Sequence, residues 1–261
     1  MQDLNSLQGS DSSDEGAQAW AIPFADMMTL LLTLFILLLV ILKESEKFVD
    51  RQINLLLEET YEQLDDKIKN EDVSIERVTK GIQITLRGNL FQSMKANVNK
   101  NYIPVIQEIS KIIEDCRLFN VGETEQYSAL MKFLDDRNEE LNVEIRCEGH
   151  TDDAILPPQS DFSNNWELSS ARSLKVVNIM NDASSISEKY FSYNGYGEFR
   201  PLINVSGIDD FQKKKQARAY NRRVEIYLDA FARPKTRSSE AEFVKMLDNK
   251  FKKEEKLQLS N

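Results

Sequence analysis

The stretch Trp20-Ala-Ile-Pro-Phe-Ala-Asp-Met-Met-Thr-Leu-Leu-Leu-Thr-Leu-Phe-Ile-Leu-Leu-Leu-Val-Ile-Leu42 decides the architecture of this chain of 261 residues. It is long enough to cross a bilayer, which takes about 20 predominantly apolar residues. It is too long for the apolar core of a signal peptide, no basic segment precedes it, and no small-x-small cleavage site follows it. The sequence therefore predicts one uncleaved membrane helix over 19–42 and a chain that spans the membrane once.

Asp26 is the only charged residue between Gly16 and Leu42. A carboxylate within a membrane helix costs about 3 kcal/mol on insertion scales, and such residues commonly bind or relay cations. Low-dielectric surroundings favour the neutral form of a carboxylate, so we predict that Asp26 carries protons. The alternative is a carboxylate that reaches the interface near the helix end. Thr29 and Thr33 follow near the same face, where their hydroxyls either line an ion path or bond to the helix backbone.

The charge balance limits the possible partners. The chain carries 33 Lys and Arg against 43 Asp and Glu, a formal net charge of −10. This balance disfavours nucleic acid as a partner, although Arg218, Arg222 and Arg223 form a small basic cluster. We recognise no nucleophile–base pair, phosphate-binding loop or metal-ligand cluster, and we expect neither an enzyme nor a cofactor. Sodium transport would need several oxygen ligands, so protons are the favoured ion. His150, the only histidine, is interpreted as a structural residue at a strand end.

The charges that flank the membrane helix bear on its orientation. Residues 1–19 contain acidic but no basic residues, whereas Lys43, Lys47 and Arg51 follow the helix. The positive-inside rule alone would place the C-terminal part in the cytoplasm. The motifs of the C-terminal domain predict the opposite orientation.

Three further segments lie outside the predicted domain. Residues 1–18 are rich in Ser, Asp, Gly and Gln, which predicts a disordered tail. Residues 43–72 form an amphipathic linker helix by their periodicity. Because its apolar stripe has no evident partner in the domain, we expect it to pair with a second copy of the chain. Residues 233–261 form a partly helical tail, in which Phe243, Leu247 and Phe251 recur at four-residue spacing.

The domain over 73–232 mixes two periodicities. Alternating apolar and polar residues predict strands, and apolar residues at three- and four-residue spacing predict helices. The predicted strands cover 82–86, 143–147, 189–194 and 224–228, and the predicted helices cover 102–113 and 168–177. The order is strand–helix–strand–helix–strand–strand, an α+β domain with one sheet and a helical layer. Residues 120–140 look partly helical, and residues 153–164 look like a loop.

Several ordered motifs resemble two known families. The membrane segment Trp20-x3-Phe24-Ala25-Asp26-Met27-Met28-Thr29 resembles the single membrane helix of MotB-type stator subunits. Four blocks of the C-terminal part resemble the OmpA-like peptidoglycan-binding domain. They are Gly149-His150-Thr151-Asp152, then Asn165-x-x-Leu168-Ser169-x-x-Arg172, then Gly195-x-Gly197 with Pro201, and finally Asn221-Arg222-Arg223-Val224. The short acidic N-terminal tail, the 12 residues between Asp152 and Asn165, and the C-terminal tail are more similar to the ZorB-type subunits of Zorya anti-phage defence systems.

The resemblance implies a fold, partners and a binding site. It implies an OmpA-like βαβαββ domain in the periplasm, an inner-membrane helix with a cytoplasmic N-terminus, and two copies of the chain inside a ring of five MotA-like or ZorA-like subunits. It also implies that Asp152 and Arg172 clasp the diaminopimelate of peptidoglycan, with Asn165, Leu168 and Arg222 lining that groove. The alternative is an internal Asp152–Arg172 ion pair. A passive tether and a flagellar-type motility stator are the alternative functions.

The two cysteines, Cys116 and Cys147, are widely spaced and form no CxxC motif. In an oxidising compartment they either pair in a disulfide or remain buried thiols. The sequence leaves both possibilities open.

Overall fold

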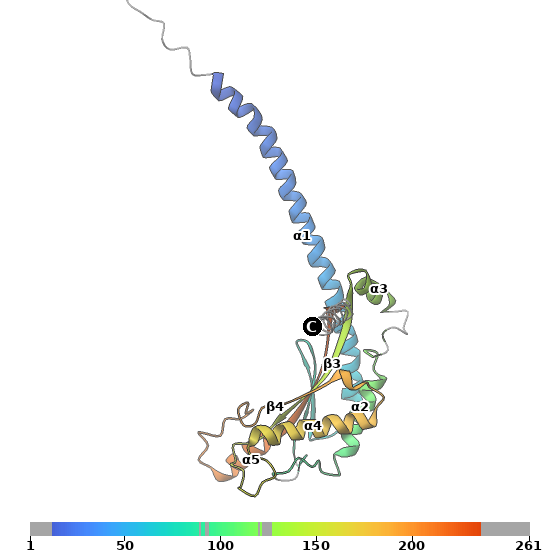
Figure 1. The fold of residues 1–261 in the computed structure, drawn as a ribbon, viewed down its shortest axis with the longest axis vertical. Coiled ribbons are helices and arrows are strands. Elements are labelled where there is room, and N and C mark those ends of the chain that lie inside the picture. Colours follow the sequence, from blue (N-terminus) through green and yellow to red (C-terminus); the bar gives the residue numbers. More distant parts are fainter. Residues whose placement is uncertain (1–11, 89, 92–93, 120, 122–126, 236–261) are drawn as a thin grey trace, which may run out of the picture. The chain divides into compact units, whose positions relative to one another are not determined.

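The computed structural model describes residues 12–88, 90–91, 94–119, 121 and 127–235 (Figure 1). The chain divides into two compact units, Met1–Arg51 and Gln52–Asn261. Residues 1–11 of the predicted N-terminal tail and 236–261 of the predicted C-terminal tail lie outside the described residues, so the helical repeat expected around Phe243 does too. Residues 12–18 are helical, although their composition predicted disorder.

Helix α1 (Ser12–Lys67) contains the predicted membrane segment. It is the one helix in the described part of the chain that is long and apolar enough to cross a membrane. Every residue from Trp20 to Glu44 is exposed in the single chain. Pro23 lies inside this helix, which begins at Ser12.

The second unit contains a five-stranded sheet in the order β1-β2-β5-β3-β4. Strands β1 and β2 form a hairpin, β5 pairs antiparallel with both β2 and β3, and β3 and β4 are parallel. The bounds are Val73–Val78 for β1, Gly81–Leu86 for β2, Glu139–His150 for β3, Phe191–Gly195 for β4 and Arg223–Pro234 for β5. A parallel pair needs a crossover connection, and α4 supplies it.

Helices α2 and α4 pack against each other, and α4 also packs on β3 and β4 (Figure 1). Besides the end of α1, the described helices of this unit include α2 (Ile103–Asp115), α3 (Ser128–Asp136), α4 (Asn165–Ala183), the 3-10 turn η3 (Glu188–Tyr190) and α5 (Phe211–Asn221). Ile109 and Ile113 of α2, Met180 of α4, and Ile145 and Ile226 of the sheet are at most 1% exposed, so they form the core between the layers.

The structure confirms the mixed α+β class and adds elements that periodicity did not predict. The side chains of β1 are half-buried or exposed, as expected at a sheet edge. Helix α5 buries only Ala217 and Asn221, so it carries almost no apolar stripe. Because hydrophobic periodicity is the signal that predicts an element, a polar helix leaves little trace in the sequence.

The burial of the linker segment overturns the premise on which pairing with a second copy was expected. Leu56, Leu57 and Leu64 are at most 1% exposed within the single chain, so the apolar stripe of this segment is already covered by its own domain. Arg117 Nη1 donates to Glu59 Oε2 at 3.0 Å, which ties the same segment to the residues after α2. The reason to expect a second copy along the linker is therefore lost.

Cys116 and Cys147 are both buried, and they form no disulfide in this structure. Burial raises the pKa of each thiol. A buried thiol that resists ionisation is a poor nucleophile and behaves as a small apolar side chain.

Candidate functional site

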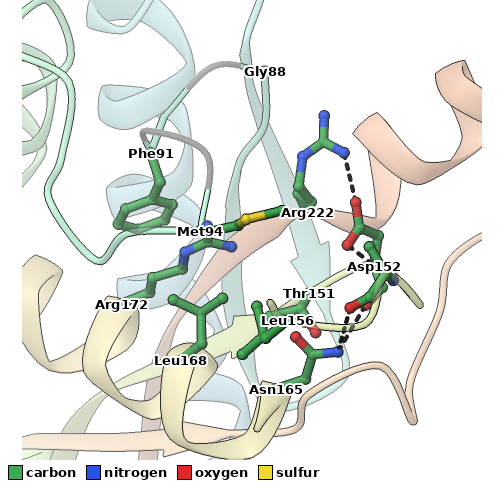
Figure 2. A pocket seen from close by; sticks show the side chains of 11 residues that line it. Gly88, Phe91, Met94, Thr151, Asp152, Leu156, Asn165, Leu168, Arg172 and Arg222 are labelled. Atoms are coloured by element: carbon green, nitrogen blue, oxygen red, sulfur yellow. Dashed lines mark hydrogen bonds and ion pairs between the residues drawn. The ribbon is translucent and has the colours of Figure 1, made fainter. Parts of the chain in front are cut away.

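A cavity of about 210 Å³ lies where β3 ends and α4 begins (Figure 2). Thr151 and Asp152 follow the last residue of β3, and α4 begins at Asn165. Asn165, Leu168 and Arg172 are three and seven residues apart on α4, so they share one helix face. The structure brings all five residues predicted for the groove to this cavity, namely Asp152, Asn165, Leu168, Arg172 and Arg222.

Asp152 forms its ion pair with Arg222, not with Arg172. The distance between Asp152 Oδ2 and Arg222 Nη1 is 2.7 Å (Figure 2). The cause is strand register: His150 of β3 lies opposite Arg223 of β5, so the residues just beyond each strand end also face each other. The internal Asp152–Arg172 pair, the alternative that the sequence left open, is not the pair that forms.

Arg172 is a buried cation in the cavity wall. It is 3% exposed, its Nε donates to the carbonyl oxygen of Lys95 at 3.1 Å, and its guanidinium lies 4.9 Å from the centre of the Phe91 ring. Burial lowers the pKa of Arg172 to about 10, the charge of Asp152 opposes this shift, and Arg222 adds to it. Arg172 therefore stays protonated at neutral pH and offers a partly desolvated positive charge, which suits a carboxylate.

Polar groups complete the wall. Asn165 Nδ2 donates to the carbonyl oxygen of Ala154 at 3.1 Å, which fixes the start of the 153–164 loop against α4 (Figure 2). Thr151 is 3% exposed, and its hydroxyl has no hydrogen-bond partner in the described parts of the chain. A buried hydroxyl normally has a partner, so Thr151 is a candidate contact for a ligand.

Sequence reasoning missed Phe91 and Met94, which close the cavity from the segment after β2 (Figure 2). This segment has no regular periodicity, and nothing in it predicts that it folds over α4. Leu156 in the loop between β3 and α4 was also missed. The cavity thus has one wall with the Asp152–Arg222 pair and a facing wall on which Arg172 lies beside the apolar side chain of Phe91 (Figure 2).

A buried charged cluster lies at the end of β3 and the start of β5. Glu148, His150 and Glu225 are all buried, with potential ligand atoms within 4.8 Å of one another. Arg146 Nε lies 3.1 Å from Glu148 Oε1, and Arg223 Nε lies 2.5 Å from Glu225 Oε1. Each carboxylate has an arginine counter-charge within the described residues, and His150 lies close to both carboxylates.

Glu225 stays ionised despite its burial. Burial by itself would raise the pKa of Glu225, but contacts with His150, Arg223 and Tyr227 outweigh it and lower the pKa to about 2. His150 Nε2 is 3.6 Å from Glu225 Oε2, longer than a hydrogen bond. Arg223 and Tyr227 are therefore the stronger partners of Glu225. The Tyr227 hydroxyl donates to Glu225 Oε2 at 2.8 Å.

The membrane helix carries the second candidate site. Asp26 is exposed, and its carboxylate has no side-chain partner within residues 12–88 and the other described ranges. Thr29 Oγ1 donates to the carbonyl oxygen of Asp26, and Thr33 Oγ1 to that of Leu30, each at 2.8 Å. Both threonine hydroxyls thus donate to the helix backbone, which is one of the two roles expected for them. Only their lone pairs remain to bind water or an ion.

Two family models match separate parts of the chain. Residues 8–53 match a family described as membrane MotB of the proton-channel complex MotA/MotB, and residues 120–215 match the OmpA family. The chain is 27% identical to motility protein B of Bacillus subtilis over 164 residues, which is 62% of this chain and 51% of that protein. It is 23% identical to the uncharacterized protein YtxE of B. subtilis over 235 residues, which is 84% of this chain and 92% of that one.

A solved structure shows the same fold. A MotB-like protein from Desulfovibrio vulgaris superimposes with a TM-score of 0.51 at 19% identity, over 71% of this chain and 99% of that one. The chain is therefore similar to MotB-type membrane proteins in its N-terminal part and to the OmpA family in its C-terminal part. The match to motility protein B spans 51% of that relative's length.

Proposed function

We propose that this chain is the proton-conducting stator subunit of an ion-driven rotary motor, anchored to peptidoglycan and assembled with a MotA-like membrane partner. The observation that carries the proposal is Asp26, the one charged residue in an apolar helix that matches the family of the MotA/MotB proton channel. A passive tether between membrane and wall needs no carboxylate in its membrane helix. That carboxylate costs about 3 kcal/mol and therefore favours the motor.

Asp26 loads a proton from one side of the membrane and releases it to the other. One elementary charge that crosses 100 mV supplies about 2.3 kcal/mol, which drives a step of the partner ring around the stator. Two copies of the chain inside five partner subunits follow from the family resemblance. Protons are favoured over sodium because the helix near Asp26 offers only the lone pairs of Thr29 and Thr33 as further side-chain oxygens.

The cavity beside α4 anchors the domain to peptidoglycan. Diaminopimelate carries both ammonium and carboxylate groups. Arg172, buried and positively charged, binds a carboxylate, while Asp152 receives the ammonium and shares its charge with Arg222. The Thr151 hydroxyl gains the hydrogen-bond partner that it otherwise lacks. Anchoring also assigns the topology: the helix lies in the inner membrane, the N-terminus in the cytoplasm and the C-terminal domain in the periplasm.

Anti-phage defence of the Zorya type, with a ZorA-like partner, is the proposed context. The acidic N-terminal tail, the 12-residue loop over 153–164 and the C-terminal extension support it. Flagellar-type motility is the second candidate, favoured by the similarity to motility protein B. The identity of the neighbouring genes separates the two.

The decisive experiment compares Asp26→Asn with Asp26→Glu in cells that carry the partner gene. Asn keeps the size and polarity of Asp but cannot exchange a proton, so we expect normal expression and assembly with no activity. Glu keeps the titratable group and should retain part of the activity. Phage protection and swimming are both scored against a deletion strain. Full activity of the Asn variant in either assay would refute proton transport and favour the tether.

A further inference from the structure

An exposed aromatic pair, Trp166 and Phe199, lies next to the cavity. Trp166 is 48% exposed and Phe199 is 61% exposed. Their ring centres are 5.1 Å apart and their planes differ by 28°, so the two rings are stacked. Single exposed aromatic residues are common on protein surfaces. A stacked pair fixed beside a binding cavity is a more specific arrangement, because it presents a rigid apolar surface to solvent.

The backbone holds this pair in place. Trp166 lies in the first turn of α4, where Asn164 Oδ1 caps the helix by accepting from the Glu167 amide at 3.0 Å. Phe199 lies just after Gly197, whose φ of 56° favours glycine. A Cβ atom on Gly197 would lie 3.4 Å from the backbone of Asn165 and Trp166. That distance is an ordinary contact, so the left-handed φ is what favours glycine in the turn that precedes Phe199.

Neighbouring residues connect the pair to the cavity. Asn165, which precedes Trp166, lines the cavity, and its side-chain amide also bonds the carboxylate of Glu198, which precedes Phe199. The amide of Thr151, another lining residue, donates to the carbonyl oxygen of Gly197 at 2.9 Å. Both aromatic residues are thus one position away from residues that are bonded at the cavity, and their own side chains lie outside its lining.

We propose that Trp166 and Phe199 stack on the apolar face of a sugar in the glycan strand of peptidoglycan, as a second subsite beside the peptide cavity. This inference rests on the proposed anchoring function. The stem peptide is covalently attached to the glycan, and three extended residues span about 10 Å. A peptide held in the cavity through its third residue therefore brings its own sugar close to the rim.

The flat aromatic surface selects this occupant. One face of a pyranose ring presents mainly C–H groups, which pack on an aromatic ring while the hydroxyl groups stay in water. A stable protein partner buries about 800 Å² on each side, far more than two side chains offer. A sugar needs only an area of the size that the pair provides.

The test measures binding of two ligands to the full-length protein in detergent. One is the free stem peptide with diaminopimelate, and the other is the same peptide on its disaccharide. We expect the disaccharide peptide to bind about tenfold more tightly by calorimetry, a difference of about 1.4 kcal/mol. Trp166→Ala should abolish this difference without changing the affinity for the free peptide. In a Trp20→Phe variant Trp166 is the sole tryptophan, and its fluorescence should respond to the disaccharide peptide only.

Phe211→Ala is the matched control, because Phe211 on α5 is also exposed, at 74%, and stacks on neither ring. It should leave both affinities unchanged. Equal affinity of the wild type for the two ligands, or an equal loss for both in Trp166→Ala, would overturn the sugar subsite and leave the anchoring function intact. Binding of neither ligand by the wild type would overturn the anchoring function and the subsite together.

Discussion

Replacement of Glu225 by Gln should destabilise the domain at neutral pH and much less in acid. The pKa of Glu225 falls from 4.5 to about 2 on folding. Each pH unit between the two values is worth about 1.4 kcal/mol, so an ionised Glu225 stabilises the folded state by about 3 kcal/mol. A discount for water at the edge of the cluster leaves about 2 kcal/mol. The Gln variant also deprives Arg223, which is 4% exposed, of its counter-charge.

The sign of the pH dependence follows from the lowered pKa. The stabilisation is fully present above pH 4.5, the value for the unfolded chain, and it is lost as the pH falls toward 2, where the folded protein also takes up the proton. We therefore expect the difference in unfolding free energy between the wild type and Glu225→Gln to shrink steadily from pH 5 to pH 2.

The assay is urea unfolding of a fragment that begins at Lys43, at a series of pH values. Glu140→Gln is the matched control, because the Glu140–Arg233 pair is exposed and should contribute only about 0.5 kcal/mol. A difference for Glu225→Gln that is the same at pH 7 and pH 3 would show that the stabilisation does not come from the ionised carboxylate, and would refute the reasoning.

Three further predictions concern the cavity, the cysteines and the assembly. Asp152→Asn and Arg172→Met should each weaken co-sedimentation of the fragment with cell-wall sacculi by about tenfold or more, since each leaves a charged group of the ligand unpaired. Arg233→Ala, at the far end of β5, should have no effect, and wild-type sedimentation of both cavity variants would disprove the site. Cys116 and Cys147 should titrate as two reduced thiols, and only after denaturation, because both are buried. A mass lower by two hydrogens in protein exported to the periplasm would contradict this. The full chain in detergent should be a dimer by light scattering. The fragment from Lys43 should be a monomer at micromolar concentration, because Leu56 and Leu64 are already buried in their own domain. A dimeric fragment would show that the linker does form the contact between the two copies.

The sequence predicted elements with a strong periodicity and missed those without one. The strand over 82–86 and the helix over 102–113 agree closely with β2 and α2, because each buries one regular face. Strand β3 extends beyond its predicted range, since its first residues are only half-buried and carry a weak alternation. Helix α5 was missed because a polar surface helix has no apolar stripe to detect.

The sequence by itself determined the membrane helix, its single carboxylate Asp26 and the family character of the domain. These properties are local: apolar length, one charge and ordered motifs can be read without knowing which segments meet. Helical spacing also predicted that Asn165, Leu168 and Arg172 share one face, because residues three and seven apart do so on any α-helix.

Only the tertiary structure decided which residues act together. The register of β3 against β5 pairs Asp152 with Arg222, 70 residues away, and leaves Arg172 on the other wall beside Phe91. The turn at Gly197 brings the Phe199 ring onto the ring of Trp166, which lies 33 residues earlier in the sequence. Such contacts depend on how the sheet and helices pack, and packing is a property of the whole fold. Periodicity within one segment contains no information about its distant partner.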